Sequence, residues 1–188
     1  MGAFKPLLPF GNKTVIECCI DYLQRGGVER IVVVLGHRAE EVRQTLRNFP
    51  IIFAFNPDSN SEMGASIAAG VRELPNSTQA TLIALSDHPA VPASVVSTLI
   101  ETWEDGARLV IPTWEGRGGH PVLVDLSFKH ELLSLSSSGG LKALFAAHPD
   151  DLKRVPVTSP FIARDMDTWD DYQALHKEVT GEPAPEQR

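Results

Sequence analysis

The sequence predicts an α/β protein, a three-layer sandwich built around a mainly parallel sheet. β-Branched apolar runs alternate along the chain with segments whose apolar residues recur at helical spacing. The clearest run, Thr81–Leu85, stops at the turn residues Ser86-Asp87-His88-Pro89, as a buried parallel strand does. The chain has 188 residues, of which 43% are apolar, and this suits one core. We expect a single domain over residues 1–180 and a disordered, polar and proline-rich tail over residues 181–188.

The first half of the chain begins with a helix that a capping box predicts. Thr14 is followed three residues later by Glu17, and a pair of glycines, Gly26-Gly27, ends the apolar helical pattern. Two strands and two helices then alternate before the run that ends at Asp87. These are a strand at Ile31–Leu35, a helix at Ala39–Asn48, a strand at Ile51–Phe55 and a helix from about Gly64 to Leu74.

The second half continues with shorter elements. Pro92 is suited to the first position of a helix that runs to about Glu104. Thr168 is suited to cap a terminal helix that ends before Gly181. Between these helices we expect strands at Leu109–Ile111, Val122–Val124 and Arg154–Val157, a glycine-rich turn at Glu115–Gly119, and helices near Phe128–Leu133 and Gly140–Ala147.

Composition and charge exclude several classes of protein. The net charge of −7 and the pI of about 5.3 argue against a nucleic-acid partner, since a non-specific binder carries a basic surface. No apolar run reaches the roughly 20 residues that span a bilayer, and the N-terminus lacks the pattern of a secretory signal. Cys18 and Cys19 are adjacent and suit neither a disulfide nor a metal site. A reduced, cytoplasmic protein without a membrane partner is the simplest interpretation.

Asp87 is the first candidate functional residue, because it follows the buried strand directly. Open α/β sheets bind ligands at the carboxyl ends of their strands, where Asp87 could hold a metal or a substrate hydroxyl. It could equally cap the next helix or form an Asx turn before Pro89. The residues alone support these two interpretations of Asp87 equally.

Two further candidates lie in the N-terminal half. Lys5 stands in the opening loop and is either a functional ammonium or an ordinary solvated charge. Asn56-Pro57 closes a strand, and Glu62–Ser66 begins a helix whose N-terminus could bind an anion or a base edge. Ordinary capping of that helix by Ser61 or Ser66 is about as good an explanation.

Two more candidates lie in the C-terminal half. In Arg117–Pro121, two glycines would let the backbone approach a ligand, and His120 is either a ligand contact or a structural histidine. Asp165 and Asp167 precede the last helix and could hold a hard cation such as Mg²⁺. Alternatively, Asp167 or Thr168 simply caps that helix.

Taken together in this order, the clusters resemble the molybdenum cofactor cytidylyltransferases and related MobA-like nucleotidyltransferases of the glycosyltransferase-A-like fold. The resemblance covers nearly the whole chain. It rests on Lys5 with Leu7-Leu8-Pro9, Asn56-Pro57, Glu62–Ile67, Ser86–Pro89 (similar to the family's Gly-Asp-Gln-Pro), Arg117–Pro121 and Asp165–Tyr172.

The resemblance implies a nucleotide-diphospho-sugar transferase-like fold and nucleotidyl transfer from CTP to a molybdopterin-type cofactor. CTP and the pterin-type cofactor are the implied partners, and a molybdoenzyme would receive the product. Asp87 and Asp167 would hold Mg²⁺, while Lys5 and Asp87 would be catalytic. The other implied contacts are Gly2, Lys5, Asn56 and Ser66 with the nucleotide, and Arg117, Gly119 and His120 with the acceptor.

One part of the family pattern is missing. The family opens with a strand and a glycine-rich phosphate loop, of which only Met1-Gly2 has a counterpart here. That strand would lie between Ile31–Leu35 and Thr81–Leu85, and its absence leaves two unpaired strand edges. Either the natural chain starts further upstream, which we favour, or the gap closes by rearrangement or with another chain.

Without the phosphate loop, we expect this chain to have low or no transferase activity. Two other functions stay open. The protein could be a non-catalytic cofactor-binding or delivery protein, or a nucleotidyltransferase that acts on another small phosphate.

Overall fold

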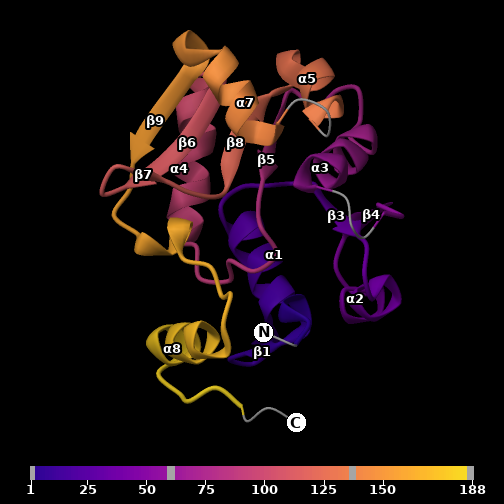
Figure 1. Ribbon diagram of the computed structural model, residues 1–188, viewed down its shortest axis with the longest axis vertical. Helices are drawn as coiled ribbons and strands as arrows, with labels where there is room; N and C mark the ends of the chain where they lie inside the picture. The colour runs from indigo at the N-terminus through magenta and orange to yellow at the C-terminus, as the bar shows by residue number, and fades with distance from the viewer. Residues whose placement is uncertain (1–2, 59–61, 136–138, 186–188) are drawn as a thin grey trace.

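Helices cover both faces of strands that fall into separate groups in the fold (Figure 1). The computed structural model describes residues 3–58, 62–135 and 139–185, and it confirms the α/β class. Its strands are β1 (Pro9–Phe10), β2 (Lys13–Thr14), β3 (Ile31–Leu35), β4 (Ile51–Phe55), β5 (Ala80–Ile83), β6 (Leu109–Trp114), β7 (Arg117–Gly118), β8 (Val122–Asp125) and β9 (Leu152–Pro156). Its α-helices are α1 (Val15–Arg25), α2 (Ala39–Thr45), α3 (Met63–Arg72), α4 (Ala93–Glu104), α5 (Lys129–Leu133), α7 (Gly140–Ala147) and α8 (Trp169–Thr180).

The strands pair in a mixed pattern, so the expectation of a mainly parallel sheet is only partly right. β3 and β4 are parallel, and so are β6 and β9. In the five-stranded sheet, however, β5 pairs with β8, β8 with β6, and β6 with β7, all antiparallel. The reason is the short connection between β6 and β8, because a parallel return requires a long crossover.

Most predicted elements are present, and the differences lie at their ends. β5 ends at Ile83, two residues before Leu85, where its pairing with β8 stops at Val122. β8 begins after Pro121, which has no amide hydrogen to donate to a ladder. Similarly, α2 ends at Thr45 and a turn follows it.

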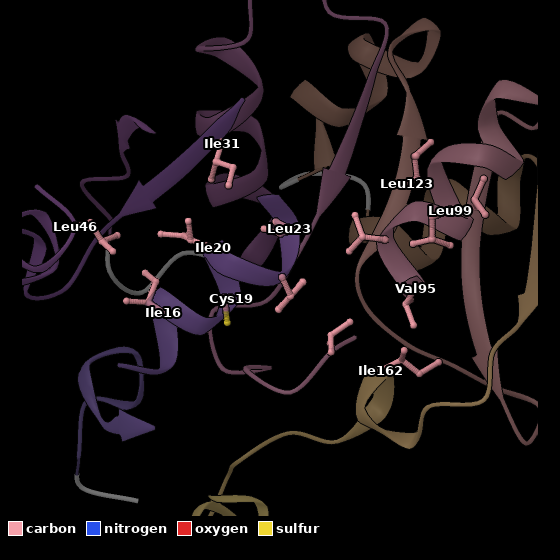
Figure 2. Close-up of a cluster of buried hydrophobic side chains, with 14 of the residues drawn as sticks. Ile16, Cys19, Ile20, Leu23, Ile31, Leu46, Val95, Leu99, Leu123 and Ile162 are labelled. Atoms are coloured by element: carbon pink, nitrogen blue, oxygen red, sulfur yellow. The ribbon is translucent and has the colours of Figure 1, made fainter. Parts of the chain in front are cut away.

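Alternate residues of the central strands point to opposite faces of the sheet. On one face, Val110 and Leu123 pack with α1 and α4, and Figure 2 shows Leu123 and Leu99 within this cluster. On the other face, Leu109 and Val124 pack with residues of α3, α5 and α7. This alternation, which follows from the two-residue repeat of a strand, confirms the three layers.

The sheet is interrupted at the position where the family's first strand was expected. β3 pairs only with β4, and β5 pairs only with β8, so no strand within the described ranges joins the two sheets. A cleft of about 830 Å³ lies there, lined by residues of β3 and β5 and by α1 and α3.

The two ends of the chain meet in a third, smaller apolar cluster. Phe10 of β1 packs with Met166 and with Tyr172 of α8, all of them buried. The Tyr172 hydroxyl donates a hydrogen bond to the Pro9 carbonyl, at 2.5 Å. Through these contacts, the segment before α8 is held beside the N-terminal segment.

No helix in the described part of the chain combines the length and the apolar character that crossing a bilayer requires. The division into residues 1–180 and a disordered tail stays a prediction, and residues 186–188 lie outside the described part.

The capping box of α1 yields a first testable prediction. Thr14 caps α1, its amide donates to Glu17 Oε2 at 2.7 Å, and its hydroxyl accepts from the Glu17 amide at 3.4 Å. Thr14→Ala should lower the free energy of unfolding by about 1 kcal/mol, because a helix amide loses its acceptor. Chemical denaturation would measure the change, and Thr14→Ser, which keeps the hydroxyl, should stay close to the parent. A loss of the same size in both variants would contradict the capping role.

Candidate active site

Three charged residues from the beginning, middle and end of the chain meet at one place. The Lys5 ammonium lies 2.7 Å from Asp167 Oδ1 and 3.3 Å from Asp87 Oδ2. The Lys5 and Asp87 side chains are about a quarter exposed, and that of Asp167 is 70% exposed. Burial lowers the pKa of Lys5, but the hydrogen bonds to Asp167 and Asp87 outweigh it and hold the pKa above its ordinary value.

Buried neighbours position the two carboxylates. Met166 is fully buried, while Asp165 and Asp167 on either side of it are exposed, as in an extended segment with one anchored side chain. Asp87 precedes His88, which is only 5% exposed. Each carboxylate therefore stands next to a residue that the core holds in place.

The structure narrows the alternatives for both aspartates. α4 begins after Pro92 without a side-chain cap, so Asp87 does not cap it. At α8 the cap is Thr168, whose hydroxyl accepts from the Asp171 amide at 3.1 Å. The carboxylates of Asp87 and Asp167 instead share the ammonium of Lys5.

The pair suits a divalent cation that arrives with phosphate oxygens. Both carboxylates reach a single positive atom, so they can face a single cation. Mg²⁺ is commonly held by one or two carboxylates together with waters and substrate phosphates. Within the described ranges, no group of three or more His, Cys, Asp or Glu side chains is placed to hold a metal ion, so waters or phosphate oxygens would complete the coordination.

Two histidines border the carboxylates, and one of them was not assigned a role from the sequence. His88 Nε2 lies 4.0 Å from Asp87 Oδ1, and the ring of His120 stands edge-on to that of His88 at 6.3 Å. His120 Nδ1 also lies 3.3 Å from the Ile83 carbonyl at the end of β5. The position of His88 directly after Asp87 was the one signal for it in the sequence.

Because His120 is buried, we expect it to make the folded protein less stable at acidic pH. Burial lowers the pKa of His120, although its contact with the Ile83 carbonyl opposes this. The unfolded chain, with a histidine pKa of about 6.5, then binds more protons than the fold as the pH falls. The free energy of unfolding should therefore decrease below about pH 6.5, and His120→Gln should make that decrease smaller.

Denaturation curves at a series of pH values from 7.5 to about 5.5 would test this prediction. His130 is exposed, and His130→Gln serves as the matched control that should leave the pH dependence unchanged. Equal pH dependence in the parent and in His120→Gln would contradict the role of His120.

The three expected acceptor residues, Arg117, Gly119 and His120, have different surroundings. An ideal Cβ on Gly119 would lie 2.2 Å from the Ile162 carbonyl oxygen, so this glycine permits a close approach of protein backbone. The amide of His120 donates to the same carbonyl at 2.8 Å. Arg117 lies exposed on β7, at the tip of the hairpin. The close approach to Ile162 gives Gly119 a structural reason of its own, and its contact with an acceptor stays a prediction.

The expected nucleotide residues Asn56 and Ser66 are adjacent in space. Asn56 is buried after β4, and its Nδ2 donates to Ser66 Oγ at 3.0 Å. Ser66 is the fourth residue of α3 and lines the cleft between β3 and β5. It is therefore not the cap of that helix, and the other candidate cap, Ser61, lies outside the described residues, as does Gly2.

Comparison with known proteins identifies relatives over most of the chain. Residues 1–152 match the family model of the MobA-like NTP transferase domain. The chain is 26% identical to nicotine blue oxidoreductase of Paenarthrobacter nicotinovorans, with 87% of this chain and 83% of that protein covered. A nucleotidyl transferase from Methanothermobacter thermautotroptrophicus has a similar structure, with a TM-score of 0.81 and 25% identity over 94% of this chain and 85% of that one.

A shorter likeness involves a larger protein. The chain is 38% identical to the bifunctional IPC transferase and DIPP synthase of Rubrobacter xylanophilus over 50% of its length. The matched region spans only 22% of that protein.

Proposed function

The chain belongs to the MobA-like NTP transferase family, and from that premise we propose that it transfers CMP from CTP to a molybdopterin-type cofactor. The observation that carries the proposal is the meeting of Lys5 with Asp87 and Asp167 across 82 and 162 residues of sequence. An ammonium and two carboxylates are the charges that a metal-bound triphosphate requires.

The reaction joins a phosphate oxygen of the acceptor to the α-phosphorus of CTP. The bond from that phosphorus to the β-phosphate bridging oxygen breaks, and pyrophosphate leaves. A bound Mg²⁺ would neutralise the charge that builds up on the phosphates. Asp87 and Asp167 would hold it.

Lys5 would turn from the carboxylates to the phosphates. With one ammonium between two carboxylates, the group carries a net charge of −1, which opposes a bare triphosphate. With a divalent cation held by Asp87 and Asp167, the net charge of the group would be +1, and the Lys5 ammonium would be available to the anion. Asn56 and Ser66, joined by their hydrogen bond, would contact the base and ribose.

Arg117, Gly119 and His120 would contact the acceptor, and the hydrogen bond from the His120 amide to the Ile162 carbonyl would hold His120 in place. The product would pass to a molybdoenzyme. The likeness to the IPC transferase and DIPP synthase favours a second candidate, a nucleotidyl transfer to another small phosphate.

The direct test is pyrophosphate release from CTP with Mg²⁺ and molybdopterin, with GTP, ATP and a sugar 1-phosphate as alternatives. Release that depends on CTP and molybdopterin supports the first candidate, and release with the sugar phosphate supports the second. Calorimetry identifies a third outcome: binding of the pterin without binding of CTP–Mg²⁺ would show a non-catalytic carrier and overturn the transferase proposal.

A further inference from the structure

The two oxygens of the Asp87 carboxylate face different side chains. Oδ2 lies 3.3 Å from the Lys5 ammonium, and Oδ1 lies 4.0 Å from Nε2 of His88. The torsion angle of an aspartate carboxylate is only broadly restricted by the side chain itself, so partners on either side decide its orientation. In the proposed reaction Lys5 turns to the phosphates, and His88 then remains beside the carboxylate.

The imidazole ring of His88 is held in place by its surroundings. The residue is 5% exposed, and its ring stands edge-on to that of His120, with 6.3 Å between the centroids and 83° between the planes. His120 is itself anchored, because its amide donates to the Ile162 carbonyl at 2.8 Å and its Nδ1 lies 3.3 Å from the Ile83 carbonyl. Close packing of this kind leaves a ring few alternative positions, so Nε2 of His88 stays on the side of Asp87.

The two nitrogens of the His88 ring have unequal surroundings. Within the described ranges, the buried Nδ1 has no hydrogen-bond partner, whereas Nε2 faces a carboxylate, which can only accept. We therefore assign the proton of the neutral ring to Nε2, where it points toward Asp87. The separation of 4.0 Å is longer than a hydrogen bond, and contacts between active-site groups are often this long until the substrate binds.

We propose that His88 is a positioning residue, whose Nε2–H orients the Asp87 carboxylate toward a divalent cation. Within the described ranges, His88 does not form a three-residue metal group with Asp87 and Asp167, so it acts through Asp87 and not as a ligand. The inference rests on the proposed function, because it requires Asp87 to bind the cation. Hydrogen-bond partners of metal ligands typically contribute about 10- to 100-fold to metal affinity.

The experiment is a calorimetric titration of the full chain with Mn²⁺ alone, for the parent and for two variants at position 88. The amide nitrogen of glutamine reaches about as far as Nε2 of histidine, whereas that of asparagine reaches only as far as Nδ1. His88→Asn should therefore weaken Mn²⁺ binding by about 10- to 100-fold. His88→Gln keeps a donor near Asp87 and should bind Mn²⁺ nearly as the parent does.

Two controls separate orientation of Asp87 from other roles of the ring. His130 is exposed on α5, and His130→Asn should leave Mn²⁺ affinity unchanged. Pulsed electron paramagnetic resonance of the bound Mn²⁺ should show no coupling to a histidine nitrogen in the parent. Such a coupling, lost in His88→Asn, would make His88 a ligand and overturn the positioning role. Equal weakening in His88→Gln and His88→Asn would also overturn it, because the donor would then not matter.

The titration also distinguishes failure of this inference from failure of the proposed function. If the parent binds Mn²⁺, Asp87→Asn binds it more weakly and His88→Asn binds it as the parent does, His88 has no positioning role and the metal site stands. If the parent binds no Mn²⁺, or Asp87→Asn binds it as tightly as the parent, the metal role of Asp87 fails and the inference fails with it.

Discussion

Asp87→Asn is expected to reduce whatever rate of CTP-dependent pyrophosphate release the parent chain shows about a hundredfold or more, the size of effect seen when one electrostatic contact to a transition state is removed. The variant keeps the size of the side chain but removes the charge that faces Lys5 at 3.3 Å. It should also weaken Mg²⁺ or Mn²⁺ binding, because one of two carboxylates is lost. Pyrophosphate release and metal titration by calorimetry would measure the two effects.

The control for this prediction is a carboxylate outside the group formed by Lys5, Asp87 and Asp167. Asp170 is exposed in the first turn of α8, three residues after Asp167. Asp170→Asn changes the net charge equally and should leave rate and metal affinity close to those of the parent. Equal losses in Asp170→Asn and Asp87→Asn would show a general charge effect and remove the specific role of Asp87.

Gly119→Ala should be the most destabilising of the substitutions considered, at about 3 kcal/mol of unfolding free energy. The added Cβ would lie 2.2 Å from the Ile162 oxygen and 2.6 Å from its carbonyl carbon, which are backbone atoms that cannot rotate away. Either the β7 hairpin or the segment that leads to Asp167 must move. A melting temperature lower by roughly 10 °C would correspond to this loss.

A second glycine of the same hairpin provides the comparison. Gly116 has a φ of +78° and nothing within 4 Å of an ideal Cβ. Gly116→Ala should therefore cost only the backbone strain of about 1 kcal/mol. Calorimetric melting of both variants measures the difference, and a cost at Gly119 no greater than that at Gly116 would contradict the packing argument.

The features that sequence analysis predicted correctly depend on residues close together in the chain. The capping box at Thr14 involves residues three positions apart, the cap at Thr168 lies directly before its helix, and both are present. The α/β class follows from local periodicity. The strand directions differed in part from the expected parallel arrangement, because pairing partners such as β5 and β8 lie about forty residues apart and no local pattern specifies them.

The candidate site, too, has features that the sequence predicts and features that only the tertiary structure decides. Order and spacing of motifs identified Lys5, Asp87 and Asp167 as candidates and indicated the family, which the match over residues 1–152 confirms. Only the tertiary structure brings the three charges together, because the long-range packing of Met166 against the N-terminal segment places Asp167 beside Lys5. The tertiary structure likewise shows that Gly119 packs closely against the backbone of Ile162. Helix caps and strand periodicity depend on neighbouring residues, whereas contacts across 82 or 162 positions exist only once the core has formed.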